Sequence, residues 1–130
     1  MPSVRIEMCQ YFPVSASKLY AAWLNSDEHA KMTGGEAEVS DLEGGSFSVW
    51  DGYITGKNIS LSPNSEIIQT WRSAEFKDSD SDSELTLQFK TVNNGCELTL
   101  IHANIPDGQP DYEKGWEEHY FAPMRRYFGG

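Results

Sequence analysis

Three acidic residues at alternate positions are the first candidates for chemistry in this sequence. Asp78, Asp80 and Asp82 lie in the segment DSDSDSE. Carboxylates spaced in this way open a calcium-binding loop, because hard cations prefer oxygen ligands. The segment lacks the glycine at loop position six and the glutamate at position twelve that such a loop uses. We therefore interpret it as a solvated turn between two strands and predict no metal site.

The histidines and cysteines lack the spacing of a zinc site. His29, His102 and His119 form no HxxxH or HExxH pattern, and Cys9 and Cys96 form no CxxC pair. No serine lies in a GxSxG elbow, and no pair of acidic residues stands out as acid and base. We predict no catalytic residue and no cofactor.

His102 is the histidine most informative about the interior. It continues the alternating apolar register of Leu98 and Leu100, so it is expected to point into the core. We expect a core histidine that bonds to a backbone carbonyl. A role in ligand binding or proton transfer is the alternative.

The largest group of aromatic residues lies in the segment KGWEEHYFAPMRRYF, residues 114–128. Trp116, Tyr120, Pro123 and Tyr127 fall within one stripe at helical spacing, and Pro123 predicts a kink or bend. We expect these rings to close the apolar face of a sheet, and imperfect packing there would leave a ligand cavity. The candidate lining comes from sheet and helix together: Trp71, Leu85, Leu87, Phe89, His102, Trp116, Tyr120 and Met124.

The elements that would position these residues follow from periodicity and caps. Alternation from Val4 to Phe12 predicts a strand, and Ser15 and Asn25 are suited to cap two short helices, the second ended by Gly34. Pro110 suits the start of the last helix. Segments of strand character lie between, and we expect an antiparallel meander: EAEVS, GSFSVW, ITGKNISL, SEIIQTWR, ELTLQFK and GCELTLIHANI.

Composition narrows the class of partner. The 130 residues fit one domain over 1–130, and the net charge of -10 disfavours nucleic acid and anionic membranes as partners. No long apolar segment predicts export or membrane insertion, so we expect a cytoplasmic protein with Cys9 and Cys96 as reduced core thiols. Arg125 and Arg126 form a local basic patch that is a candidate protein-binding site.

Several segments together resemble a known family. They are PVSASKLYAAWL, GGSFSVWDGYITGKN, LSPNSEIIQTWR, ELTLQF, CELTL, NIPDG and GWEEHYFAPMRRYFGG. In this order they resemble the C-terminal domain of the activator of the heat shock protein 90 ATPase, over nearly the whole chain. The resemblance implies the helix-grip fold of the START-like superfamily: an α+β fold in which a curved antiparallel sheet wraps around a long C-terminal helix.

The resemblance also sets the order of the expected functions. In the eukaryotic activator a separate N-terminal domain supplies most of the ATPase stimulation, and this chain begins at its first strand, so the full activity is not expected here. A co-chaperone-like module that binds a heat shock protein 90-type chaperone comes first. A carrier of a small hydrophobic molecule comes close behind, and a polyketide cyclase-like enzyme comes last.

Overall fold

The computed structural model describes residues 3–106, 108–109 and 111–129. Pro110 lies outside them. One strand comes first, two short helices and six strands follow, and a helical segment ends the chain. The elements are β1 Ser3–Phe12, α1 Ala16–Trp23, α2 Ser26–Thr33, β2 Ala37–Val39, β3 Ser46–Val49, β4 Ile54–Ser62, β5 Glu66–Ser73, β6 Ser83–Val92, β7 Gly95–Pro106, α3 Tyr112–Trp116, the π-helical turn η1 Glu117–Phe121 and α4 Ala122–Gly129.

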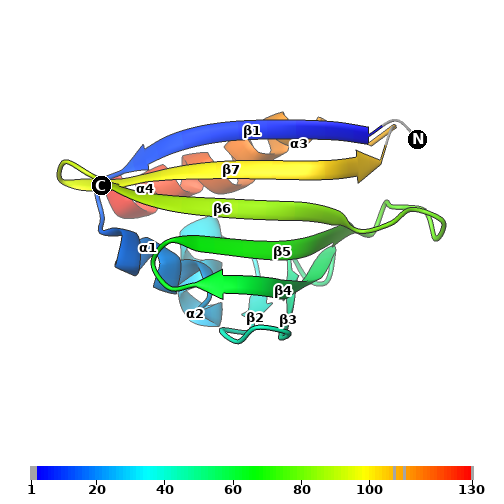
Figure 1. The fold of residues 1–130 in the computed structure, drawn as a ribbon, viewed down its shortest axis with the longest axis horizontal. Coiled ribbons are helices and arrows are strands. Elements are labelled where there is room, and N and C mark those ends of the chain that lie inside the picture. Colours follow the sequence, from blue (N-terminus) through cyan, green and yellow to red (C-terminus); the bar gives the residue numbers. More distant parts are fainter. Residues whose placement is uncertain (1–2, 107, 110, 130) are drawn as a thin grey trace.

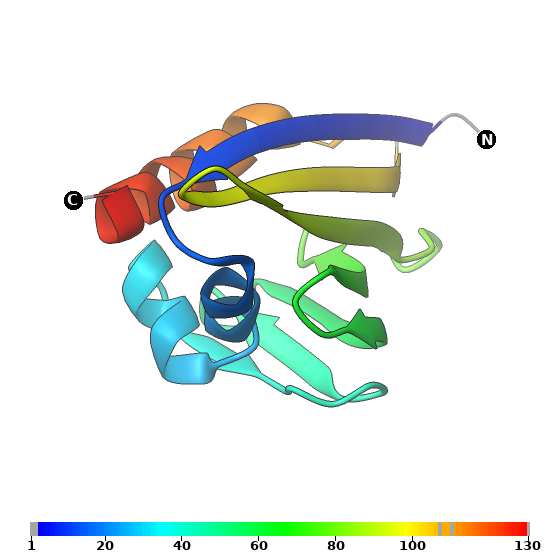
Figure 2. The ribbon, with the colours of Figure 1, turned by 60° about the vertical axis from the view of Figure 1, so that its left-hand side comes forward.

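The seven strands form one antiparallel sheet in the order β1-β7-β6-β5-β4-β3-β2 (Figure 1). Each strand from β2 to β6 pairs with the next along the chain, and β1 pairs with β7 at the other edge of the order. The sheet is curved, and all the helices lie on its concave side (Figure 2). The predicted helix-grip architecture is therefore confirmed.

Both short helices begin where their N-caps predict, and α2 also ends at its predicted glycine. The Ser15 side chain accepts from the Lys18 N–H, and the Asn25 side chain accepts from the Glu28 N–H, so each satisfies a free donor of a first turn. Gly34 ends α2 with φ +82°, a left-handed conformation that favours glycine. These caps direct the chain from β1 to β2 across the open side of the sheet.

The C-terminal helix departs from α-helical geometry just before Pro123. Over Glu117–Phe121 it makes a π-turn, in which the Ala122 N–H bonds to the Glu117 carbonyl. The wider turn brings two consecutive side chains, Tyr120 and Phe121, into the interior. Beyond it the buried face shifts, so the expected inward position of Tyr127 is wrong: its side chain is 40% exposed.

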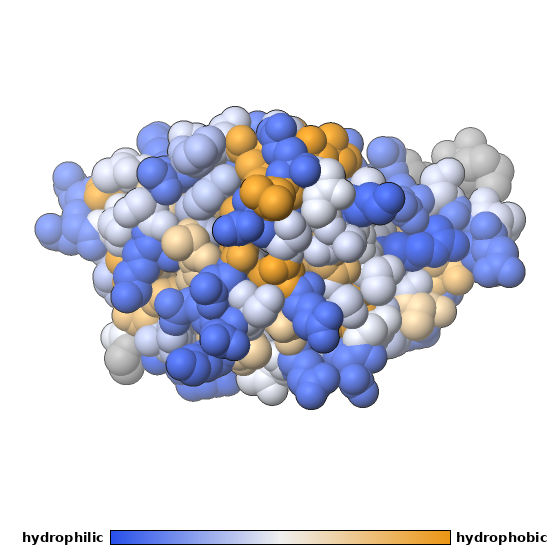
Figure 3. Space-filling model, turned by 90° about the horizontal axis from the view of Figure 1, so that it is seen from below, coloured by the Kyte–Doolittle hydropathy of each residue, from blue (hydrophilic) through white to orange (hydrophobic). Residues whose placement is uncertain are grey.

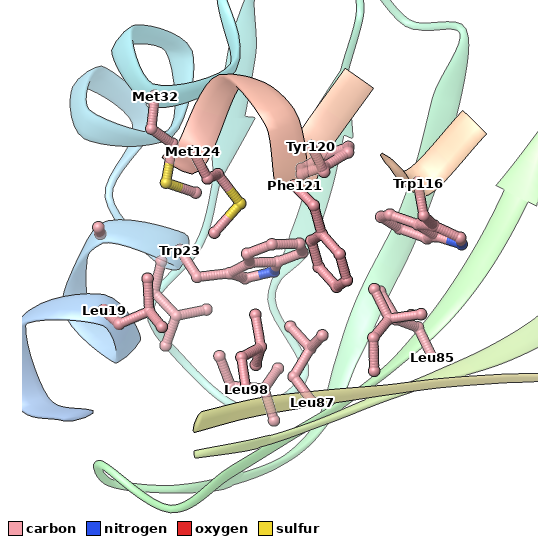
Figure 4. Close-up of a cluster of buried hydrophobic side chains, with 14 of the residues drawn as sticks. Leu19, Trp23, Met32, Leu85, Leu87, Leu98, Trp116, Tyr120, Phe121 and Met124 are labelled. Carbon is pink, nitrogen blue, oxygen red and sulfur yellow. The ribbon is translucent and has the colours of Figure 1, made fainter. Parts of the chain in front are cut away.

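A core of aliphatic and aromatic side chains fills the space between helices and sheet (Figure 4). Along β6 and β7 the predicted alternation is confirmed, because Leu85, Leu87, Leu98 and Leu100 are all buried. Opposite them lie buried side chains of the helices: Leu19, Trp23, Met32, Trp116, Tyr120, Phe121 and Met124. Burial of these apolar surfaces is the main contribution to the free energy that stabilises the packing of the helices on the sheet.

The surface around this core is mainly hydrophilic on the side of β2 to β4, with a small group of hydrophobic residues near its middle (Figure 3). Leu42 is the most exposed large hydrophobic residue among those described, at 68%. Within the described ranges, no helix is long and apolar enough to cross a membrane.

One expectation about the reactive side chains is wrong and one is confirmed. Both cysteines are free thiols, but only Cys96 is buried, and Cys9 lies on the exposed face of β1. The acidic segment is a turn, as predicted, and Arg72 organises it. The Arg72 guanidinium donates to the carbonyls of Lys77 and Asp80 and forms an ion pair with Asp82 at 3.1 Å.

Candidate functional site: an aromatic pocket

A pocket of about 280 Å³ opens where the C-terminal helix meets the β3–β4 loop. Six of its nine lining residues are tryptophan or tyrosine, and we name it the aromatic pocket. Its lining is Trp50, Tyr53, Ile54, Trp71, Tyr112, Gly115, Trp116, His119 and Tyr120. Trp71 and Trp116 are almost fully buried and form its floor, whereas Tyr53 at its rim is 39% exposed.

A strained loop supplies one wall of the pocket. Trp50, Asp51 and Gly52 follow one another with φ +55°, +58° and +83°, all in the left-handed region. This conformation costs about 1 kcal/mol or more at each of the two non-glycine positions. Trp50 lies against Gly35, where an added Cβ would come within 2.3 Å of the indole ring. The sequence thus keeps a bulky ring in an unfavourable backbone conformation at the pocket, a pattern found at binding sites.

The helix supplies the opposite wall through a glycine and the π-turn. Gly115 lies in α3, where glycine is disfavoured by about 1 kcal/mol relative to alanine. An added Cβ there would meet no atom within 4 Å, so it would face open space. The π-turn carries His119 and Tyr120 into the lining, and such turns are frequent at functional sites.

A buried chain of hydrogen bonds fixes Trp116 to the sheet. The Trp116 indole N–H donates to Nδ1 of His102 at 3.1 Å, and Nε2 of His102 lies 2.8 Å from the Ser83 hydroxyl. Because an indole N–H only donates, Nδ1 must accept, and Nε2 carries the proton that it donates to Ser83. Ser83 then donates to the Trp71 carbonyl at 2.7 Å. The expected carbonyl partner of His102 is therefore wrong, since its partners are two side chains.

This arrangement excludes His102 as a base for Ser83. The pair has the residues and the distance of a nucleophile and its base, but the proton on Nε2 points at the hydroxyl. Burial lowers the pKa of His102 to about 3, so it stays neutral. His102 therefore links the helix to the sheet through its two side-chain partners.

A second buried histidine fixes Tyr120 one turn further along the helix. The His29 Nδ1–H donates to the Trp23 carbonyl at 2.9 Å, and Nε2 accepts from the Tyr120 hydroxyl at 3.0 Å. Burial lowers the pKa of His29 to about 4 and raises the pKa of Tyr120. The two histidines thus hold two side chains of the C-terminal helix, Trp116 and Tyr120, in fixed positions beside the pocket.

The two outer tyrosines also direct their hydroxyls to the protein. Tyr53 donates to the Glu75 carboxylate, and Tyr112 donates to the Gln109 side chain at 2.7 Å. The hydrogen bond to Glu75 raises the pKa of Tyr53. Four of the ring side chains in the lining therefore have their polar ends engaged, and they present carbon surfaces to the pocket.

The eight predicted lining residues separate into two groups. Trp71, Trp116 and Tyr120 line the aromatic pocket together. These three and Leu85 also border a small interior void of about 10 Å³. The other four are buried but are not part of the pocket lining: Leu87, Phe89, His102 and Met124. The cavity expected along the sheet is thus largely filled, and the open space lies at one end of the helix.

Several residues in or beside the aromatic pocket were not predicted from the sequence. Trp50 was assigned to the strand GSFSVW and Tyr53 was not singled out, although two aromatic residues around Asp-Gly are an available signal. Gly115 inside a helical pattern is a second signal, because it costs helix stability without ending the helix. His29 carried no signal, since its partner Tyr120 is 91 positions away.

A larger groove of about 820 Å³ lies on the outer face of β3 to β5. It is lined largely by serine, threonine and charged residues, including Lys57, Arg72 and Asp82. Arg72 already pairs with Asp82 there. The groove has few aromatic and apolar side chains compared with the aromatic pocket, so we take the aromatic pocket as the candidate site.

The structure separates the two predicted basic residues. Arg125 forms an ion pair with Glu117, which lowers the pKa of that carboxyl, and it donates to the Gln10 side chain at 2.9 Å. Arg126 is exposed, and no ion pair to it appears within the described residues. Only Arg126 therefore remains as a free cation of the predicted patch.

Curated relatives share moderate sequence similarity with this chain. The human activator of 90 kDa heat shock protein ATPase homolog 1 is 25% identical over 130 residues, which covers 99% of this chain and 38% of the relative. The activator of 90 kDa heat shock protein ATPase homolog from Dictyostelium discoideum is 28% identical over 127 residues and covers 95% and 32%. The chain thus spans about a third of the length of these relatives.

A solved structure and a family match extend the comparison. The crystal structure of an HSP90 activator from Plasmodium falciparum has the same fold, with a TM-score of 0.86, 24% identity and coverage of 96% of both chains. Residues 13–129, which include all the lining of the aromatic pocket, match the family described as Activator of Hsp90 ATPase homolog 1-like protein, and this chain is therefore a member of that family.

Proposed function

We propose that this domain is a co-chaperone-like module that binds a heat shock protein 90-type chaperone. The family match over residues 13–129 carries this proposal, and relatives named as activators of that chaperone's ATPase support it. The buried Ser83–His102 pair has the wrong proton position for catalysis, which favours a binding role over an enzymatic one. Whether the domain alone stimulates the ATPase is part of the test.

Arg126 is the residue that we assign to the chaperone contact. It is a free cation at the end of α4 in a protein of net charge -10, so an acidic surface of the partner would be attracted to it locally. Arg125 is less suited, because Glu117 and Gln10 already hold its guanidinium.

Calorimetric titration of the chaperone with the purified domain tests this proposal, together with an ATPase assay. We expect measurable binding that weakens with added salt, and about a threefold loss of affinity in Arg126→Glu. Lys18→Glu is the matched control, because Lys18 is an exposed cation on α1. No binding by the unmodified domain would refute the proposal, and an equal loss in the control would refute the assignment of Arg126.

A second function is supported by the aromatic pocket itself. We propose that it holds a small apolar or partly apolar molecule, because its lining is aromatic and it is open at a rim of exposed rings. Native mass spectrometry of the purified domain would reveal a co-purified molecule. The pocket and Arg126 share no residue, so the two functions can be tested separately.

A further inference from the structure

The polar ends of the pocket side chains restrict what it can bind. Tyr53, Tyr112, Trp116 and Tyr120 all donate their O–H or N–H groups to other parts of the protein. A ligand that needs hydrogen bonds would find few partners on these four rings, and an unpaired polar group in a pocket costs about 1–3 kcal/mol. These four rings therefore favour a ligand group that forms no hydrogen bonds, whereas the lining also includes the ring nitrogens of Trp71 and His119.

Two kinds of group meet that requirement: a neutral hydrocarbon and a quaternary ammonium. The nitrogen of a quaternary ammonium carries four carbon substituents and no N–H, so its charge is presented through methyl groups. The faces of tryptophan and tyrosine rings are electron-rich and attract such a cation. Three tryptophans and three tyrosines line this one pocket.

Charge favours the cation over the hydrocarbon. The protein carries a net charge of -10, and neither lysine nor arginine is among the described residues that line the pocket. Lys114, which precedes Gly115, pairs with Glu118 at 3.8 Å. At the rim, the Glu75 carboxylate accepts from the Tyr53 hydroxyl and so increases the electron density of that ring.

Size limits the ligand further. The volume of about 280 Å³ is at the small end of ligand sites, which span roughly 300–1,000 Å³. The void behind the floor adds only about 10 Å³, so a long acyl chain has no room to extend inward. The pocket therefore fits a compact head group or a small free molecule.

We propose that the aromatic pocket binds a small, free quaternary ammonium compound and holds its trimethylammonium group against the floor rings Trp71 and Trp116, with Trp50 at the side. Tyr53 and Tyr112 complete the enclosure toward the rim. This inference rests on the proposed small-molecule function and specifies its ligand class. It is independent of the chaperone proposal.

Choline and its neutral carbon analogue 3,3-dimethylbutan-1-ol test the inference, because they have nearly the same shape and differ in charge. Both are titrated into the full chain at pH 8 and low salt, with tryptophan fluorescence and calorimetry as readouts. We expect saturable binding of choline, at least about tenfold tighter than that of the analogue.

Two outcomes of these titrations, and one outcome of a parallel titration with a trimethyllysine peptide, would overturn the inference in different ways. If the neutral analogue binds as tightly as choline or more tightly, the pocket binds apolar molecules and has no preference for a cation. Binding of neither compound would refute the cation inference and count against the small-molecule function. If a trimethyllysine peptide binds and choline does not, the ligand is a modified protein and the proposal of a free small molecule is wrong.

A variant that fills the pocket from the helix side tests whether choline binds there. Gly115→Leu adds a side chain where a Cβ meets no atom within 4 Å, so we expect a folded protein that has lost choline binding. Gly129→Leu is the matched control, because Gly129 also has free space but lies outside the pocket lining. Cooperative thermal unfolding of Gly115→Leu at or above the wild-type temperature confirms that the fold is intact. Choline binding of wild-type strength in that folded variant would refute the location.

Discussion

The two ends of the interface between the C-terminal helix and the sheet are built differently. At the α4 end, Phe121 and Met124 are completely or almost completely buried, and Phe12 lies edge-on to Phe121 with ring centroids 6.2 Å apart. At the α3 end, Tyr112 and Trp116 stand beside an open pocket. The same helix on the same sheet therefore serves as core at one end and as a candidate site at the other.

The difference lies in how the side chains are held. At the α4 end, the phenylalanine rings have no polar tip to be held by a hydrogen bond, and the flexible Met124 side chain fills the remaining space, so that end closes. The rings at the α3 end are rigid, and hydrogen bonds hold their polar ends, as in Trp116 to His102 and Tyr120 to His29. Rings fixed at their tips cannot collapse into the gap between them. This is how a small domain keeps a cavity without losing its core.

The largest expected effect comes from truncating the closed end. Phe121→Ala should lower the free energy of unfolding by about 3–5 kcal/mol, because it opens a cavity in the packed core. Tyr112→Ala at the open end should cost much less, about 1–2 kcal/mol, since half-buried Tyr112 already borders empty space. Urea unfolding of the two variants measures both. Similar losses would contradict the division of the interface into a packed and an open end.

Acid should weaken the hydrogen bonds that maintain the open end. The pKa values of His29 and His102 are lowered by burial to about 4 and about 3, so between these values and about 6.5 the unfolded chain binds protons that the folded chain does not. Stability is therefore retained at neutral pH and lost as pH falls. From pH 7 to pH 5 the loss should be about 2 kcal/mol per histidine.

The variant His29→Gln separates the two histidines. Urea unfolding at pH 7 and pH 5 should show a pH-dependent loss roughly half that of the wild type, because only His102 then contributes. A variant with the full wild-type dependence on pH would show that other groups cause it.

The smallest effect should be a gain in stability at the open end. Gly115→Ala should raise the free energy of unfolding by up to about 1 kcal/mol, because alanine favours the helix and its Cβ meets no neighbour. Thermal unfolding checks this. A destabilised variant would mean that the space beside Gly115 is not free.

Much of the fold was predictable, because its signals are local. Alternation along β6 and β7 defines the buried face, and Ser15 and Asn25 mark the helix starts. The position of the site was only partly predictable. Trp71, Trp116 and Tyr120 were found from their stripe and register, but Leu87 lies in filled core because the opposing helix packs closely there.

The sequence alone determined the antiparallel meander, the capped helices, the aromatic C-terminal segment and the family resemblance, since each depends on residues close together in the chain. Only the tertiary structure decided which rings meet at a cavity and which protons the buried histidines carry. It brought together Tyr120 with His29 and Trp116 with His102, and the π-turn rotated the end of the helix. These outcomes depend on packing between distant segments, which spacing along the chain does not encode.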